Sequence, residues 1–322
     1  MIVREEIRRL QSHVGRVILG QDVLVERLLI TLLADGHLLV EGAPGLAKTS
    51  AVKVLASALE GDFHRIQFTP DLLPADLTGT EVFKPAEGSF EFQKGPLFHN
   101  ILLADEINRS PAKVQSALLE AMAERQVTVG RTTYRLPELF MVMATQNPIE
   151  QEGTYPLPEA QRDRFLLHTR IGYPDKETER EVLAQTRERA RTGKPIDGPP
   201  SAVISQETVF AARKEVLGLH LAPELENYLV QLVVATRDPA PFDPVLAPLI
   251  AYGGSPRASL ALDVMSRAKA WLDGRDFVSP EDIQALAPDV LRHRLLLTYE
   301  AEADGVTQDE IVDRLLSVVA VP

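Results

Sequence analysis

The chain has 322 residues, of which 45% are hydrophobic and 25% charged, an ordinary balance for a globular protein with a sizeable core. It contains no cysteine, which excludes a disulfide framework and a thiolate metal site. The formal net charge of −12 argues against bulk electrostatic binding to duplex DNA and favours a protein partner. No apolar run approaches the roughly 20 residues that span a bilayer, and residues 1–10 do not resemble a signal peptide. We therefore expect a cytoplasmic protein without membrane insertion.

The first half of the chain alternates strand-like and helix-like segments, which predicts a parallel sheet with helices on its faces. The expected strands cover residues 38–41, 64–67, 101–105, 140–145 and 165–170. The expected helices cover residues 22–35, 48–59 and 111–124. A longer insertion follows at residues 69–96, and Gly130-Arg131 is predicted to be the turn of a β-hairpin.

Strand signals stop after Tyr173-Pro174, and the rest of the chain is predicted to be helical. The expected helices cover residues 175–191, 205–216, 223–236, 257–273 and 280–294. Residues 192–201 are rich in glycine and proline and predict a linker or surface loop. We therefore predict an α/β parallel-sheet core over residues 1–172, followed by a smaller all-α domain over residues 173–322.

The most informative motif is Gly42-Ala43-Pro44-Gly45-Leu46-Ala47-Lys48-Thr49, which follows a short apolar run. A buried strand that breaks into a glycine-rich turn and opens a helix with Lys-Thr is typical of a phosphate loop. Lys48 would place its charge beside the β- and γ-phosphates of ATP, and the Thr49 hydroxyl would hold Mg²⁺. Ala47 stands where the pattern has its second glycine, and its methyl group is compatible with a negative φ. ATP and Mg²⁺ are the predicted cofactors.

Two polar clusters follow buried strands further along the chain. Asp105 and Glu106 end an apolar strand, at the edge where ligands bind in open α/β sheets. Asp105 would help to hold Mg²⁺, and Glu106 would act as general base toward the attacking water. Asn147 follows the strand at residues 140–145 and stands before Pro148, so it would contact the γ-phosphate or orient the water.

These motifs, in this order, resemble those of the AAA+ ATPases. The individual residues of the motifs resemble those of the MoxR family over nearly the whole chain. The resemblance rests on residues 18–21, 42–49, 67–74, 104–109, 144–148, 157–165 and 254–258. Alanine is common in that family at the position of Ala47. The family implies an αβα nucleotide-binding core with an all-α lid, in a homo-oligomeric ring, a hexamer, that works as a chaperone-like remodeller. It also implies a partner protein with a von Willebrand factor A domain.

The resemblance implies roles for further residues. Arg164 matches the arginine finger that is donated to the ATP of the neighbouring subunit, with Arg162 as the competitor. Arg257 matches the sensor-2 arginine, which would reach back to the γ-phosphate. Gln67 is either a partner that restrains Glu106 or a plain strand-end amide. The residues implied to contact the nucleotide are Ile18, Gly20, Gly42, Ala43, Pro44, Gly45, Leu46, Ala47, Lys48, Thr49 and Ser50.

Residues 69–96 resemble the helix-2 insert of related motors, and the Gly130-Arg131 hairpin resembles their pre-sensor-1 hairpin. A group of aromatic and basic side chains there would contact a polypeptide substrate or belong to an ordinary hairpin: Phe83, Lys84, Phe90, Phe92 and Lys94. Three alternatives remain at this point: a nucleic-acid translocase, a scaffold that binds ATP without turnover, and a metal-chelatase motor subunit. The negative charge disfavours the first, and the intact Asp105-Glu106 pair disfavours the second.

Overall fold

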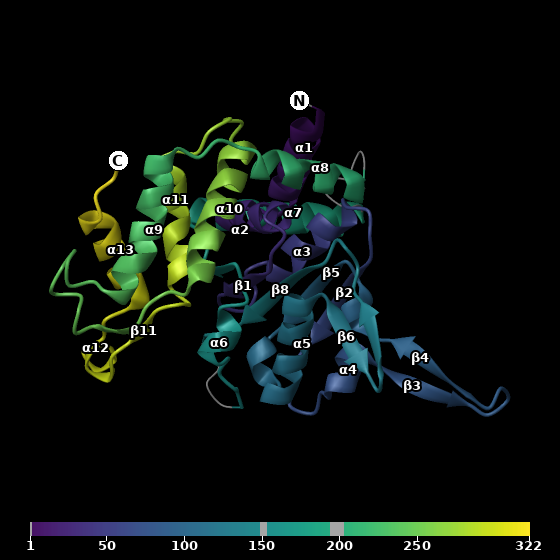
Figure 1. Cartoon of the computed structure of the whole chain (residues 1–322). Coiled ribbons are helices and arrows are strands. Elements are labelled where there is room, and N and C mark those ends of the chain that lie inside the picture. Colours follow the sequence, from purple (N-terminus) through teal and green to yellow (C-terminus); the bar gives the residue numbers. More distant parts are fainter. Residues whose placement is uncertain (1, 149–152, 194–202) are drawn as a thin grey trace.

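A five-stranded parallel sheet is the centre of the N-terminal half in the computed structural model, which describes residues 2–148, 153–193 and 203–322 (Figure 1). The strand order is β2-β5-β8-β1-β9, and every neighbouring pair is parallel. The strands are β1 (Leu38–Glu41), β2 (Phe63–Gln67), β5 (Ile101–Asp105), β8 (Met141–Gln146) and β9 (Leu167–Arg170). The α/β class and all five predicted strands are confirmed, with ends that shift by one or two residues.

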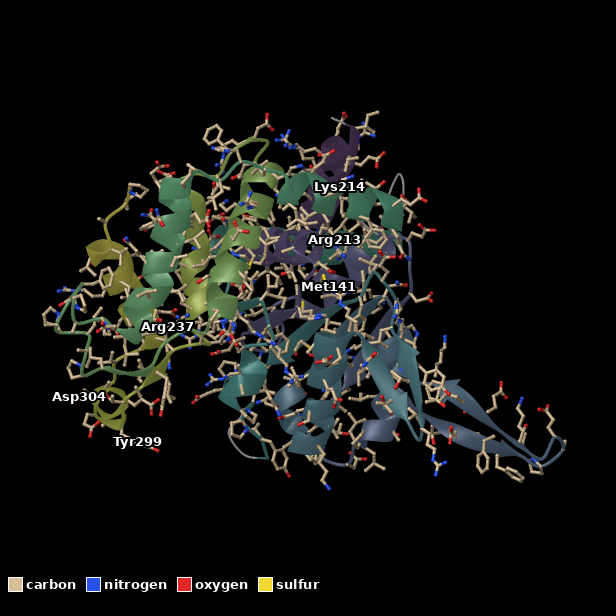
Figure 2. The ribbon with its side chains drawn as sticks, in the orientation of Figure 1. Met141, Arg213, Lys214, Arg237, Tyr299 and Asp304 are labelled. Atoms are coloured by element: carbon tan, nitrogen blue, oxygen red, sulfur yellow. The ribbon has the colours of Figure 1, made fainter. Side chains whose placement is uncertain are left out.

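Side chains of the central strands alternate between two buried layers. Met141 and Met143 pack with the layer that contains α1 (Ile2–Val17), α2 (Asp22–Leu33) and α3 (Lys48–Ser57). Val142 and Ala144 pack with α5 (Ala112–Glu124) on the opposite face. Strands covered on both faces read as continuous apolar runs, which is why β5 and β8 were visible in the sequence. Figure 2 shows Met141 in the interior beneath the helices.

The insertion at residues 69–96 forms a short helix, α4 (Pro74–Thr78), and a hairpin of β3 (Gly79–Lys84) and β4 (Ser89–Lys94). The hairpin projects far from the body of the molecule (Figure 1). A 3₁₀ turn, η1 (Pro96–Phe98), leads back to β5. The predicted second hairpin is confirmed as β6 (Gln126–Val129) and β7 (Thr132–Arg135).

Aromatic side chains join the two hairpins at their bases. The rings of Phe92 on β4 and Tyr134 on β7 are stacked with centroids 4.1 Å apart. Phe98 packs edge-on against both rings, and Lys94 lies over Phe98. Stacked aromatic pairs stabilise a contact beyond their buried area. The base of the projecting hairpin is therefore fixed to the β6–β7 hairpin.

The C-terminal half is a helical layer beside the sheet (Figure 1). Its helices are α7 (Lys176–Thr192), α8 (Gln206–Leu217), α9 (Pro223–Arg237), α10 (Pro256–Leu272), α11 (Pro280–Leu291), α12 (Tyr299–Ala303) and α13 (Gln308–Val318). The predicted cap at Asp175 is confirmed, since its side chain accepts a hydrogen bond from the Thr178 N–H. Most of the predicted linker, residues 194–201, lies outside the described residues.

One prediction about this half is wrong. β10 (Ile250–Tyr252) and β11 (Leu296–Leu297) pair in a small antiparallel sheet, so strands do occur after residue 174. Strands of two or three residues are too short to show a period-two pattern. Among the described helices, none is long and apolar enough to cross a membrane.

The two halves share one buried apolar cluster and are joined by ion pairs. Arg27 on α2 lies 2.7 Å from Asp289 on α11, and both side chains are buried. Arg294, just after α11, lies 2.7 Å from Asp163, which follows the short helix α6 (Glu159–Arg162). Removing one member of a buried pair leaves the other charge without compensation, so these contacts fix the helical layer against the core.

Candidate active site

The predicted phosphate loop, residues 42–49, runs from the end of β1 into α3. A Cβ atom at Gly42 would lie 2.5 Å from Cγ1 of Ile171, so only glycine fits where the loop passes β9. A Cβ at Gly45 would meet nothing within 4 Å, and Gly45 has a φ of +84°. The side chains of Ala43 and Leu46 are buried, whereas Pro44 and Ser50 are exposed. The loop therefore anchors two side chains in the core and leaves an open backbone cradle at the N-terminus of α3.

Ala47 has a φ of +57°, in the left-handed region, so the expectation of a negative φ is wrong. The turn needs this conformation at the position before the helix, where the motif more often has glycine. A non-glycine residue in this region costs about 1–2 kcal/mol. Backbone strain of this kind persists where the surrounding structure fixes the conformation, and it is frequent at ligand-binding turns.

Lys48, the first residue of α3, lies inside the cradle. Its Nζ donates a hydrogen bond to the carbonyl of Gly42 across the loop. Burial lowers the pKa of Lys48, while the nearby carboxylates of Asp105 and Glu106 act in the opposite direction. A partly desolvated ammonium facing into the loop is suited to bind phosphate oxygens.

Two oxygen donors converge beside the cradle. The Thr49 hydroxyl donates to Oδ2 of Asp105 across 3.5 Å, and Asp105 is almost completely buried. Thr145, near the end of β8, donates to the other carboxylate oxygen at 2.6 Å. A hydroxyl and a carboxylate are hard oxygen ligands of the kind that Mg²⁺ prefers, so the donor set fits this ion.

Glu106 follows Asp105 with a φ of +58°, which turns its side chain away from the strand direction. Its N–H donates to the Thr145 hydroxyl at 2.9 Å. Its carboxylate accepts a hydrogen bond from Nε2 of Gln67 at 2.6 Å and lies 3.3 Å from Arg109 in the 3₁₀ turn η2 (Ile107–Arg109). Gln67 thus contacts Glu106 directly, as a restraining partner would.

Asn147 lies at the same edge of the sheet. It follows β8, which pairs with both β1 and β5, and its side chain is buried. The carbonyl of Gln146, the preceding residue, accepts a hydrogen bond from the N–H of Gly42 at 3.3 Å. Asn147 therefore stands between the phosphate loop and the Asp105-Glu106 pair.

The segment with Ile18 and Gly20 packs at the start of the helical layer. Ile18 is buried, and Gly20 has a φ of +71°. A Cβ at Gly20 would lie 2.4 Å from a side-chain carbon of Thr178 on α7. Gln21 donates to the carbonyl of Gly172 at 3.3 Å. The segment is therefore held against the junction between core and helical layer.

The two predicted site arginines, Arg164 and Arg257, lie together in a hollow apart from the phosphate loop. Arg164 and Arg257 both line a hollow of about 230 Å³, together with Asp163 and Arg294. Within the described ranges, the phosphate loop and the Asp105-Glu106 pair contribute no residue to it. Arg257 is exposed at the start of α10, and Arg164 is half-buried and donates to the carbonyl of Leu119 on α5 at 2.6 Å. The rest of the lining is apolar, and Arg294 is paired with Asp163, so among the described residues Arg164 and Arg257 are the two cations of the hollow without a carboxylate partner in its lining.

Arg162 differs from Arg164 in its environment. Its Nε atom is buried and has no hydrogen-bond partner among the described residues. Burial lowers the pKa of His293, and the charge of Arg162 contributes to the same shift. Arg162 thus faces inward, whereas Arg164 borders the open hollow.

Sequence reasoning missed three residues that contact the Asp105-Glu106 pair or line the hollow with Arg164 and Arg257. Arg65 lies at the Asp105 carboxylate, Thr145 bridges Asp105 and Glu106, and Arg294 holds Asp163 in the hollow. Arg65 stands two residues before Gln67, so the period of two places both on one face of β2. This period of two could have predicted from the sequence that Arg65 lies on the same face as Gln67. Thr145 and Arg294 needed the strand order and the packing of α11.

Comparisons with known proteins agree with this geometry. Residues 37–167 match the ATPase family associated with various cellular activities (AAA), and residues 245–315 match the AAA lid domain. The chain is 48% identical to chaperone MoxR1 of Mycobacterium tuberculosis over 98% of this chain and 82% of the relative. It is 33% identical to protein MoxR of Paracoccus denitrificans over 98% of this chain and 96% of the relative. A crystal structure from Cytophaga hutchinsonii, assigned as an ATPase, covers 100% of this chain and 96% of its own, with 47% identity and a TM-score of 0.91.

Proposed function

Because the chain belongs to the MoxR family of AAA+ ATPases, we propose that it is a Mg²⁺-dependent ATPase that assembles into a ring and remodels partner proteins. The observation that carries the proposal is the convergence of Lys48, Thr49, Asp105 and Glu106 at the carboxyl edge of the parallel sheet. Ligands bind at this edge in open α/β sheets. The core comprises residues 1–172 and the lid residues 173–322 in this proposal, with the boundary after β9.

Each residue at the edge has a role in hydrolysis of ATP to ADP and phosphate. The backbone of residues 42–50 and the Lys48 ammonium bind the phosphates, and Ile18 and Gly20 border the adenine. Thr49 and Asp105 hold Mg²⁺, which when bound neutralises charge on the phosphate oxygens. Glu106 takes a proton from the attacking water, and Asn147 orients that water.

Arg164 acts on the ATP of the neighbouring subunit, and Arg257 reaches from the lid to the γ-phosphate. Both line one hollow to which, in the part of the chain that the structure describes, the phosphate loop of the same chain does not contribute, which supports an action of Arg164 on a nucleotide held by another molecule. A guanidinium is suited to the task because its planar fork is permanently charged and matches phosphoryl oxygens. The ring, with six subunits by family resemblance, would complete each site in this way.

Replacement of Lys48 by alanine is expected to weaken ATP binding by about 10²-fold, the scale of a lost charge-assisted hydrogen bond in a partly desolvated site. Titration with a fluorescent ATP analogue measures the change. Lys53→Ala is the matched control because Lys53 lies on the same helix but is exposed. Near-normal affinity in Lys48→Ala would refute the phosphate-loop assignment.

The partner in this proposal is a protein with a von Willebrand factor A domain, by family resemblance. The tip of the projecting hairpin offers a place to bind it, since Phe83 and Phe90 are directly opposite each other and 50% and 68% exposed. Their ring centroids are 5.1 Å apart, so the two rings form one apolar patch. The other side chains of the group are engaged within the chain: Lys84 pairs with Glu91, Phe92 stacks on Tyr134, and Lys94 covers Phe98.

Replacing both Phe83 and Phe90 by serine is expected to lower recovery of the partner at least fivefold while ATP turnover without partner stays unchanged, because about 1 kcal/mol of contact is lost per ring. Quantitative mass spectrometry of proteins that co-purify with tagged wild type and variant measures this. Tyr299→Ser is the control, since Tyr299 is 89% exposed at the far edge of the lid (Figure 2). Equal partner recovery from both variants and wild type would contradict the hairpin assignment.

A further inference from the structure

Arg65 lies beside Asp105, one of the two proposed Mg²⁺ ligands, although none of the nucleotide-binding motifs contains Arg65. Its Nε and one terminal nitrogen donate to Oδ2 of Asp105 at 3.0 and 2.7 Å. The same oxygen lies 3.5 Å from the Thr49 hydroxyl. The guanidinium therefore occupies the carboxylate oxygen with which Asp105 would face a cation held jointly with Thr49.

The same guanidinium reaches Glu106 through Gln67. Arg65 donates to Oε1 of Gln67 at 2.7 Å, and Nε2 of Gln67 donates to Oε2 of Glu106 at 2.6 Å. The first bond fixes which end of the Gln67 amide faces Arg65, so the donor end faces Glu106. A continuous path of hydrogen bonds thus joins Asp105 to Glu106 through two side chains of β2.

We propose that Arg65 is a positioning residue that acts as a metal-sensitive latch on Glu106, an inference that rests on the proposed function. Without a divalent cation, Arg65 neutralises Asp105 and holds Gln67 against Glu106. A divalent cation at Thr49 and Asp105 displaces the guanidinium by competition for the same oxygen. Gln67 then loses the bond that orients it, and Glu106 is free to turn toward the water.

The surroundings of Arg65 make this exchange possible. Its side chain is 48% exposed, whereas that of Asp105 is 12% exposed. An ion pair open to water on one side contributes little to stability, and a long flexible side chain can return to solvent when it is displaced. Arg109 lies 3.3 Å from Oε2 of Glu106, the same oxygen that accepts the hydrogen bond from Gln67.

Binding of Mn²⁺ to the protein saturated with a non-hydrolysable ATP analogue tests the latch, with free Mn²⁺ followed by electron paramagnetic resonance. Arg65→Gln is expected to tighten Mn²⁺ binding about three- to fivefold, the scale of one partly exposed ion pair. Arg109→Gln removes the same charge from a side chain that contacts Glu106, and it is expected to change the Mn²⁺ affinity by less than half as much. An equal effect of both variants, or no effect of Arg65→Gln, would overturn the inference.

A double-mutant cycle tests the path through Gln67. If Arg65 and Gln67 form one latch, the gain in Mn²⁺ affinity from Arg65→Gln shrinks when Gln67 is already alanine, because contacting residues are not additive. Arg65→Lys keeps the charge but lacks the planar guanidinium that donates to both Asp105 and Gln67. The Mn²⁺ affinity of this variant is therefore expected to lie between those of wild type and Arg65→Gln. Fully additive effects of the two substitutions on Mn²⁺ affinity would show that Arg65 does not act on Glu106 through Gln67, and would contradict the latch.

The same titration distinguishes the latch from the proposed function. Asp105→Asn is expected to weaken Mn²⁺ binding, because it removes a charged ligand. If Asp105→Asn weakens binding and Arg65→Gln leaves it unchanged, only the latch is wrong. If Asp105→Asn has no effect, the metal site itself is wrong, and the proposed function fails with it.

Discussion

Arg164→Ala is expected to lower ATP turnover per chain by about 10³-fold, the scale of the loss when an arginine finger is removed. The affinity for ATP is expected to stay at the wild-type value. The reason is that Arg164 borders a hollow shared with Arg257, and its charge would stabilise the transition state in the neighbouring subunit rather than bind nucleotide in its own. Turnover is measured by phosphate release and affinity with a fluorescent analogue. Wild-type turnover per chain is also expected to rise with protein concentration, because the site is complete only in the assembly.

Two further arginines serve as controls for Arg164. Arg180→Ala removes an exposed arginine of α7 and is expected to leave turnover unchanged. Arg162→Ala removes an inward-facing side chain, so its main effect is expected on the free energy of unfolding. A loss of 10³-fold in Arg162→Ala with a normal melting temperature, and normal turnover in Arg164→Ala, would transfer the finger to Arg162.

Glu106→Gln is expected to reduce hydrolysis by about 10²-fold or more and to leave ATP binding intact, because it removes the general base but no phosphate contact. The ATP-bound assembly should then accumulate, which size-exclusion chromatography with bound-nucleotide analysis would detect. Glu120→Gln is the matched control, since Glu120 is exposed on α5. Normal turnover in both Glu106→Gln and Asp105→Asn would show that the acid pair is not the catalytic site.

The sequence was sufficient for the elements whose pattern is local. β5 and β8 are buried on both faces and read as apolar runs, and the phosphate loop has a fixed order of residues at the start of α3. The site residues at strand ends followed from the same reasoning, because the carboxyl ends of parallel strands share one edge.

The features that were missed depend on contacts between distant segments. The pairing of Gln67 with Asp105 depends on strand order, and this pairing of β2 with β5 brings Arg65 to the Asp105 carboxylate. The left-handed φ of Ala47 is imposed by the turn and overrides the preference of alanine. The assignment of Arg257 to the γ-phosphate stays a prediction, but its place in one hollow with Arg164 depends on the packing of α10 beside Asp163 and was not visible in the sequence.

Mixing Arg164→Ala chains with Glu106→Gln chains tests most directly whether each active site is built from two subunits. Either variant alone is nearly inactive, but a mixed assembly pairs the intact Glu106 of one chain with the intact Arg164 of its neighbour. ATP turnover is therefore expected to recover on mixing, with a maximum near equal amounts of the two variants. No recovery at any ratio, together with wild-type turnover that does not depend on protein concentration, would contradict a shared site.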